Sequence, residues 1–114
     1  MKIAIVGSRS FQDYGLLMKT MAKHKPSAIV SGGAKGADTL AERYAGEIGV
    51  DCIIFKPDWK RYGRAAGPKR NKQIVEAADR IIAFWNGKSR GTFSTITLAM
   101  KARKPVDVVR FVEK

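Results

Sequence analysis

The amino-acid sequence predicts an α/β fold, a three-layer αβα sandwich around a five-stranded parallel sheet, and two patterns predict it. Five short apolar runs, rich in β-branched residues, alternate along the whole chain with segments whose apolar residues recur at helical spacing. The runs are apolar almost throughout rather than at every second position, which is typical of parallel strands covered by helices on both faces. The length fits one such domain, residues 1–114.

The predicted strands are the apolar runs themselves, and most of them end at a residue that favours a loop. They span residues 2–6, 28–31, 52–56, 80–85 and 106–110. Helical spacing predicts four helices between them, and the clearest places the apolar residues of 37–48 on one face. The other three contain residues 14–21, 71–78 and 96–103. This strand–helix alternation indicates a doubly wound, Rossmann-like order.

Charge is the first functional observation. Lys and Arg number 22 against 10 Asp and Glu, which gives a formal net charge of +12. Such a chain attracts anions, so nucleic acid, phosphorylated small molecules and acidic proteins are all candidate partners. The excess is concentrated in residues 56–72, where seven basic side chains accompany a single acid, Asp58.

Several function classes lack the residues that they need. No apolar run approaches the ~20 residues of a membrane span, and the first apolar run is too short for a signal peptide. Cys52 is the single cysteine, which we interpret as a buried side chain of a cytoplasmic protein without disulfides. His24 is the single histidine, interpreted as a helix cap, so no metal site, zinc cluster or Ser-His-acid set is predicted.

The candidate binding residues lie where the predicted strands end, because an open parallel sheet binds ligands outside the carboxyl ends of its strands. In the first such loop, Gly7 allows close approach, Ser8 offers a hydroxyl, and the Arg9 guanidinium matches a phosphate. The alternative is that Ser10 or Asp13 caps the first helix while Arg9 faces solvent.

The second loop carries the strongest signal, because three glycines directly precede an amphipathic helix. Bare main-chain N–H groups at a helix N-terminus bind phosphate, and a lysine in the loop adds positive charge. The aspartate is interpreted as a helix cap or as a partner for a ribose hydroxyl or a base edge. The alternative is a tight turn that binds no ligand. The candidate residues of this loop are Ser31, Gly32, Gly33, Lys35, Gly36 and Asp38.

The third loop, between the third strand and the next helix, is too long and too rich in aromatic and basic residues for a plain connection. Asp58 and Trp59 are candidate binding residues at its start, and Trp59 can stack on a base together with Tyr62. Arg70 and Asn71 begin the next helix on the ligand side. The alternative is a solvated basic loop in which Trp59 packs inward.

The fourth loop is another strand–glycine–helix junction, and its threonine can cap the helix while offering a hydroxyl to phosphate. The run Gly87-Lys88-Ser89 is similar to the end of a Walker loop. That motif requires a glycine five residues earlier, where Ile82 stands, so a P-loop NTPase is excluded. The candidate residues of this loop are Asn86, Gly87, Ser89, Arg90, Gly91 and Thr92.

Four motifs in order make the sequence resemble the SLOG superfamily over residues 2–110: Gly-Ser-Arg, Ser-Gly-Gly-Ala-Lys-Gly-Ala-Asp, Ala-Gly-Pro-Lys-Arg-Asn and Asn-Gly-Lys-Ser-Arg-Gly-Thr. The superfamily joins Smf/DprA DNA-processing proteins to LOG phosphoribohydrolases, and the sequence is most similar to its small YspA-type branch, often encoded by phages or bacteria. The resemblance implies a Rossmann-like fold, a nucleotide-derivative pocket at the strand ends, and a homodimer like that of LOG proteins. It does not supply a reaction.

The resemblance also bears on catalysis. In LOG enzymes an arginine after the third strand and a glutamate beyond the glycine loop act on an N-glycosidic bond. Arg70 is similar to that arginine and is the candidate catalytic residue. The position of the glutamate is Thr95, and no acid occurs from residue 92 through residue 104. Asp38 or Asp58 would have to substitute for it.

Three functions are therefore expected, in this order. The first is a sensor or sequestering module for a phosphate-bearing, nucleotide-derived small molecule such as ADP-ribose, an NAD-like compound or a nucleoside monophosphate. The second is a hydrolase of an N-glycosidic or phosphate bond in such a ligand. The third is single-stranded nucleic-acid binding, which the net charge of +12 and the pair Trp59 and Tyr62 would suit. No membrane partner is expected, and the only cofactor considered is the nucleotide or ADP-ribose derivative itself.

Overall fold

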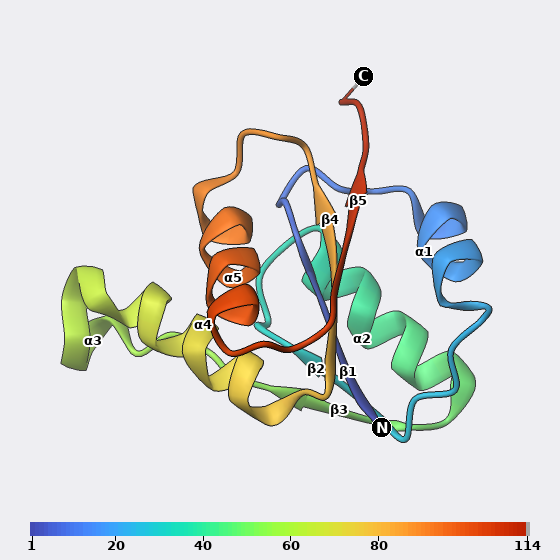
Figure 1. The fold of residues 1–114 in the computed structure, drawn as a ribbon, viewed down its shortest axis with the longest axis horizontal. Coiled ribbons are helices and arrows are strands. Elements are labelled where there is room, and N and C mark those ends of the chain that lie inside the picture. The colour runs from blue at the N-terminus through green and yellow to red at the C-terminus, as the bar shows by residue number, and fades with distance from the viewer. Residues whose placement is uncertain (114) are drawn as a thin grey trace.

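The computed structural model describes residues 1–113 and has the predicted Rossmann-like architecture. Its five strands form one sheet in the order β3-β2-β1-β4-β5, and every neighbouring pair is parallel (Figure 1). The strands are β1 (Lys2–Gly7), β2 (Ala28–Ser31), β3 (Asp51–Ile54), β4 (Arg80–Trp85) and β5 (Val106–Arg110). The prediction of an α/β fold with a five-stranded parallel sheet is confirmed.

The helices connect successive strands and cover both faces of the sheet. On one face α1 and α2 pack on one set of strand residues, which includes Ile3 and Ile5. On the other face α4 and α5 pack on the alternate set, which includes Ala4 and Val6. The helical elements are α1 (Tyr14–Met21), α2 (Ala37–Ile48), α3 (Trp59–Tyr62), the 3₁₀ turn η1 (Gly63–Ala65), α4 (Ala66–Ala77) and α5 (Arg90–Lys101). Within residues 1–113, none of these helices combines the length and apolarity needed to cross a bilayer.

The strand order reverses at β1, and this reversal positions the functional site. The chain moves outward from β1 to β2 and β3, then returns so that β4 pairs with the other side of β1. The helices that follow β1 and β4 lie on opposite faces of the sheet, so their connections diverge at the carboxyl ends of these two strands. A crevice between such connections is the usual binding place of a doubly wound sheet.

Two helices begin earlier than their apolar spacing predicts. α4 starts at Ala66, five residues before Asn71, although Pro68 lies in its first turn. Proline is tolerated there because the first N–H groups of a helix have no intrahelical acceptor. α5 starts at Arg90, and Ser89 rather than Thr92 is its cap, since the Ser89 hydroxyl accepts a hydrogen bond from the N–H of Thr92.

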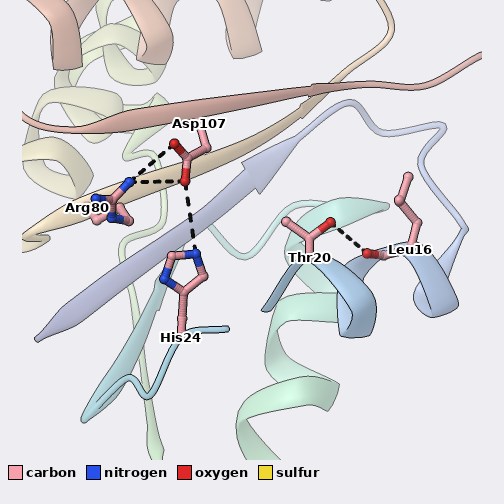
Figure 2. A network of polar contacts seen from close by, with 5 residues as sticks. All are labelled: Leu16, Thr20, His24, Arg80 and Asp107. Atoms are coloured by element: carbon pink, nitrogen blue, oxygen red, sulfur yellow. Dashed lines mark hydrogen bonds and ion pairs between the residues drawn. The ribbon is translucent and has the colours of Figure 1, made fainter. Parts of the chain in front are cut away.

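The amino ends of the strands form a polar cluster far from the crevice (Figure 2). The Arg80 guanidinium donates to both carboxylate oxygens of Asp107 at 3.1 and 3.2 Å, which joins β4 to β5. The Nε2 atom of His24 lies 4.0 Å from the same carboxylate. His24 was expected to cap α1, and its main-chain N–H does donate to the Met21 carbonyl at 2.9 Å, while its ring points toward Asp107.

A lysine stabilises the far end of α4. The ammonium group of Lys104, just before β5, donates to the carbonyl oxygens of Val75, Glu76 and Ala78 at 2.6, 3.0 and 2.7 Å. These carbonyls lie at the carboxyl end of the helix, where the last turn leaves them without intrahelical donors and where the helix dipole favours a cation. The loop after α5 is thereby attached to α4.

Candidate functional site

A cavity of about 440 Å³ opens at the carboxyl ends of β1 and β4, where the strand order reverses. We call it the strand-end cavity. Its walls come from the loop after β1, the start of α2, the first half of α4 and the loop that leads into α5. The lining residues are Val6, Gly7, Ser8, Arg9, Ser10, Ala34, Asp38, Arg70, Asn71, Ile74, Asn86, Ser89, Gly91, Thr92 and Thr95.

The loop after β1 holds the cavity walls together. Gly7 is required there because a Cβ atom would lie 2.5 Å from the Phe84 carbonyl oxygen and 2.7 Å from the Ala37 side chain. Ser8 is 2 % exposed, its N–H donates to the Phe84 carbonyl, and its hydroxyl accepts from the N–H of Asn86 at 3.3 Å. Ser8 therefore joins the first loop to the fourth, while its hydroxyl hydrogen stays available.

The glycine-rich second loop is closed by its own aspartate. Asp38 is 6 % exposed, and its carboxylate accepts from the N–H of Ala34 at 3.0 Å. The N–H of Gly33 donates to the Ser31 hydroxyl at 3.4 Å, and that of Ala37 donates to the Ser8 carbonyl. The sequence predicted that these three N–H groups would be free to bind phosphate. They instead form hydrogen bonds within the protein, because acceptors close to them compete with a ligand. Asp38 does not cap α2.

A buried guanidinium links the second loop to α4. Arg70 donates from Nη1 to the Gly32 carbonyl at 2.7 Å and from Nε to the Asn71 side chain at 3.0 Å. Its Nη2 group makes no hydrogen bond within residues 1–113. Gly32 is required by this arrangement, since a Cβ atom would lie 2.5 Å from Nη1 of Arg70 and 2.9 Å from the Asp38 carboxylate.

The electrostatics of the cavity favour an anion. Burial raises the pKa of Asp38, while the Ala34 N–H and the Arg70 charge oppose that rise. Burial also lowers the pKa of Arg70; the Asp38 charge opposes this shift, and the positive charge of Arg9 adds to it. Arg9 and Arg70 both line the cavity, so a negatively charged group bound there would be attracted to two guanidinium groups.

The loop after β4 contributes hydroxyls and a helix N-terminus. The Asn86 side-chain oxygen accepts from the N–H groups of Lys88 and Ser89, both at 2.8 Å. The hydroxyls of Ser89 and Thr92 lie 3.0 Å apart at the first turn of α5. The N–H groups of the first helical residues have no acceptor within the helix, and Gly91, in this first turn of α5, lines the cavity.

One carboxylate at the rim was not predicted from the sequence. Glu113 accepts hydrogen bonds from the Ser10 hydroxyl at 2.7 Å and from the Asn86 side-chain amide. These bonds from Asn86 and Ser10 lower its pKa. An isolated glutamate near the end of the chain has no motif around it, so only the three-dimensional structure reveals the contact.

Ten of the predicted site residues line the strand-end cavity, and nine lie elsewhere. The structure brings together Gly7, Ser8, Arg9, Asp38, Arg70, Asn71, Asn86, Ser89, Gly91 and Thr92. The predicted residues outside its lining are Ser31, Gly32, Gly33, Lys35, Gly36, Asp58, Trp59, Gly87 and Arg90. Their part in ligand binding stays a prediction, as does the catalytic role of Arg70.

Most of the nine support the cavity from outside or face away from it. Gly36 has a φ of +77°, and a Cβ atom there would lie 2.4 Å from the Arg9 carbonyl oxygen. Gly87 has a φ of +83°, and a Cβ atom there would lie 2.4 Å from Nη2 of Arg110. Lys35 is exposed, and Asp58 caps α3 by accepting from the N–H of Arg61 at 3.2 Å.

Five further residues complete the cavity walls: Val6, Ser10, Ala34, Ile74 and Thr95. The sequence contained no signal for Val6, Ala34 and Ile74, because apolar or small residues carry none, and it indicated Ser10 only as a possible helix cap. Thr95 occupies the position at which LOG enzymes have their glutamate. Thr95 is 2 % exposed, and its hydroxyl donates to the Gly91 carbonyl at 3.2 Å. Asp38 is the one carboxylate among the residues that line the cavity.

A parallel doubly wound sheet with a polar, arginine-lined cavity at its switch point defines a Rossmann-like domain of the kind that binds ligands at its strand ends. More particularly, the chain belongs to the YspA, cpYpsA-related SLOG family, whose model matches residues 1–62. It is 34 % identical over 116 residues to the Gene 61 protein of Mycobacterium phage D29, a match that covers 92 % of this chain and 93 % of the phage protein.

Two solved structures share the fold. DNA processing protein A from Helicobacter pylori, described for its single-stranded DNA binding mode, matches 95 % of this chain and 64 % of its own with a TM-score of 0.71 and 25 % identity. DNA processing protein A (DprA) from Streptococcus pneumoniae matches 94 % of this chain and 49 % of its own with a TM-score of 0.73 and 24 % identity. This chain therefore spans about half to two thirds of those proteins.

Proposed function

We propose that this protein binds single-stranded nucleic acid and that the strand-end cavity holds one phosphate-bearing nucleotide of the strand. The observation that carries the proposal is that Arg9 and Arg70 line one cavity together with the hydroxyl-bearing residues Ser8 and Thr92. Guanidinium groups and hydroxyls are the usual partners of phosphate oxygens.

Two further observations support this ligand class. The net charge of +12 favours a polyanion over a neutral metabolite. The Helicobacter pylori relative, which is described as a single-stranded DNA-binding protein, has the same fold over nearly all of this chain. A duplex buries the edges of its bases in pairs, whereas a cavity of about 440 Å³ accepts one unpaired nucleotide.

Fluorescence anisotropy with a labelled thymidine octamer tests the proposal. We expect binding that weakens with salt and that is lost at least tenfold in Arg9→Gln, while a duplex of equal length competes poorly. Lys23→Gln is the matched control, because Lys23 is exposed at the opposite end of the strands and the variant loses the same single charge. Equal affinity of Arg9→Gln and Lys23→Gln at 150 mM salt would contradict the proposal.

A free nucleotide-derived small molecule, such as ADP-ribose or a nucleoside monophosphate, is the second candidate. The observation in its favour is the enclosure of Asp38, whose carboxylate lines the cavity and can meet a ribose hydroxyl. Calorimetry with AMP, ADP-ribose and NAD tests it. If one of them binds with micromolar affinity and an excess of the octamer does not change that affinity, the small molecule and not the nucleic acid would be the ligand of the strand-end cavity.

A further inference from the structure

A second hollow adjoins the strand-end cavity and is lined by more cations than that cavity. It has a volume of about 450 Å³ and lies between α3 and α4. We call it the α3–α4 groove. Its lining residues are Lys56, Pro57, Asp58, Arg61, Tyr62, Ala66, Lys69, Arg70, Lys72, Gln73 and Glu76. Five of these side chains are cations and two are acids.

The two acids compensate only part of the positive charge of the groove, because they face five cations. Asp58 accepts from the main-chain N–H of Arg61 as the cap of α3, and Glu76 pairs with Lys72 at 4.0 Å. Within residues 1–113, the other four cations of the groove form no salt bridge. A row of unpaired cations along a groove is the feature that follows a phosphate backbone.

An aromatic side chain lies among these cations. Tyr62 is 38 % exposed, with Nζ of Lys69 4.8 Å from the centre of its ring and the Arg61 guanidinium 5.1 Å away. α3, which carries Tyr62, projects from the body of the domain beyond α4 at the left edge of Figure 1. Both cations lie over the ring, so a base that stacks on Tyr62 would take the place of one of them, and the two charges would then be near the adjoining phosphates.

Arg70 connects the groove to the strand-end cavity, because its side chain lines both. Its Nη1 atom is fixed by the Gly32 carbonyl, so the guanidinium forms a shared wall rather than a mobile surface group. A ligand that leaves the strand-end cavity over Arg70 enters the groove directly.

We propose that the α3–α4 groove is a second nucleotide subsite, which takes the nucleotide next to the one in the strand-end cavity and stacks its base on Tyr62. The ligand is then an oligonucleotide of at least two residues. This inference rests on the proposed function. An acidic protein segment is the competing occupant, but the ring of Tyr62 and the continuity with the strand-end cavity favour nucleic acid.

The dependence of affinity on oligonucleotide length tests the inference. Thymidine 5′-monophosphate and single strands of two, four and eight thymidines are compared on the wild type, Tyr62→Ala, Lys69→Gln, Arg9→Gln and the control Lys23→Gln. Tyr62 and Lys69 are exposed, so their variants are expected to keep the fold, which circular dichroism checks. Arg70 is left unchanged because it belongs to both hollows.

We expect the octamer to bind Tyr62→Ala and Lys69→Gln about fivefold or more weakly than the wild type. The mononucleotide should bind both variants as it binds the wild type. In Lys69→Gln the slope of log affinity against log salt should fall by about 0.7, as the loss of one phosphate contact requires. Arg9→Gln should weaken the binding of every length.

Different results overturn the inference and the proposed function. Wild-type affinity of Tyr62→Ala and Lys69→Gln for the octamer, with Arg9→Gln impaired, would remove the second subsite and leave the proposed function intact. Failure of the wild type to bind the octamer would remove both. Displacement of the octamer from the wild type by a polyglutamate peptide but not from Lys69→Gln would assign the groove to an acidic protein.

Discussion

Gly32 is the residue at which three parts of the site meet. Its carbonyl holds Arg70 from α4, its Cα faces the Asp38 carboxylate from α2, and it directly follows the last residue of β2. The glycine is required for space, because its φ is not in the left-handed region. Arg70 is 38 residues from Gly32 in sequence. It can approach the second loop because Gly32 has no Cβ methyl group.

The first prediction concerns this missing methyl group. Gly32→Ala should displace the Arg70 guanidinium and weaken octamer binding at least tenfold, with only a small loss of stability, because the crowded atoms are the ends of flexible side chains. Gly46→Ala in α2 is the control, since nothing lies within 4 Å of its added methyl group. It should raise the free energy of unfolding by about 0.5–1 kcal/mol and leave binding unchanged. Unaltered binding in Gly32→Ala would contradict the role assigned to Arg70.

The second prediction concerns the pH dependence that Asp38 imposes on stability. Burial raises its pKa in the folded state above the unfolded value of 3.8. Its contribution to stability is therefore complete below pH 3.8 and is lost as the pH rises through the folded pKa. Asp38→Asn cannot ionise, so its free energy of unfolding relative to the wild type should increase between pH 3.5 and 7.5. Urea titrations across this range measure the difference, and a difference that does not vary with pH would refute the prediction.

At the scale of elements, the patterns in the sequence predicted the sheet better than the site. The strands at residues 28–31, 80–85 and 106–110 match the structure, because apolar runs bounded by loop residues leave few alternatives. The third strand begins and ends slightly earlier than predicted, at Asp51 and Ile54. It lies at an edge of the sheet and is only partly buried, so burial fixes its limits less strongly.

The loops were less predictable than the strands because their contacts cross the fold. The expectation that the second loop offers bare N–H groups did not anticipate that Asp38 would turn back to Ala34. α3 formed within a segment predicted to be a loop, where Asp58 provides a local cap that the basic composition concealed. Pairings such as Glu113 with Ser10, 103 residues apart, leave no trace in local spacing.

The third prediction concerns the attachment of α4 by Lys104. Lys104→Met keeps the length of the side chain but removes the ammonium group that binds three carbonyls. We expect a loss of about 2 kcal/mol in the free energy of unfolding, as for other charged hydrogen bonds. Lys101→Met, at an exposed position in the last turn of α5, should change it by less than about 0.5 kcal/mol. Equal stability of the two variants in urea titrations would show that the three hydrogen bonds contribute nothing.

At the scale of the whole molecule, positive charge extends well beyond the site. Only Arg9 and Arg70 among the cations line the strand-end cavity, whereas the chain as a whole carries a net charge of +12. Charges that touch no ligand still shape the field through which a polyanion approaches, and they act on the rate of association more than on the rate of dissociation.

The fourth prediction separates these two rates. The double variant Lys23→Gln, Lys25→Gln removes two exposed charges at the amino ends of the strands, far from the cavity. In stopped-flow mixing with the octamer, its association rate should fall below that of the wild type at 10 mM salt, where the Debye length is about 30 Å. The difference should vanish at 300 mM salt, and the dissociation rate should not change. A changed dissociation rate would mean that these lysines contact the ligand.

The hydrogen bonds from Ser10 and Asn86 to Glu113 decide how the protein should be tethered for any of these measurements. Since they hold the last described residue at the cavity rim, an affinity tag or fluorescent fusion added behind it would emerge beside the mouth and obstruct incoming strands. Met1 lies at the other end of the sheet, where its amino group donates to the Ser27 hydroxyl. Affinity tags, fluorescent fusions and attachments to a sensor surface should therefore be added before Met1.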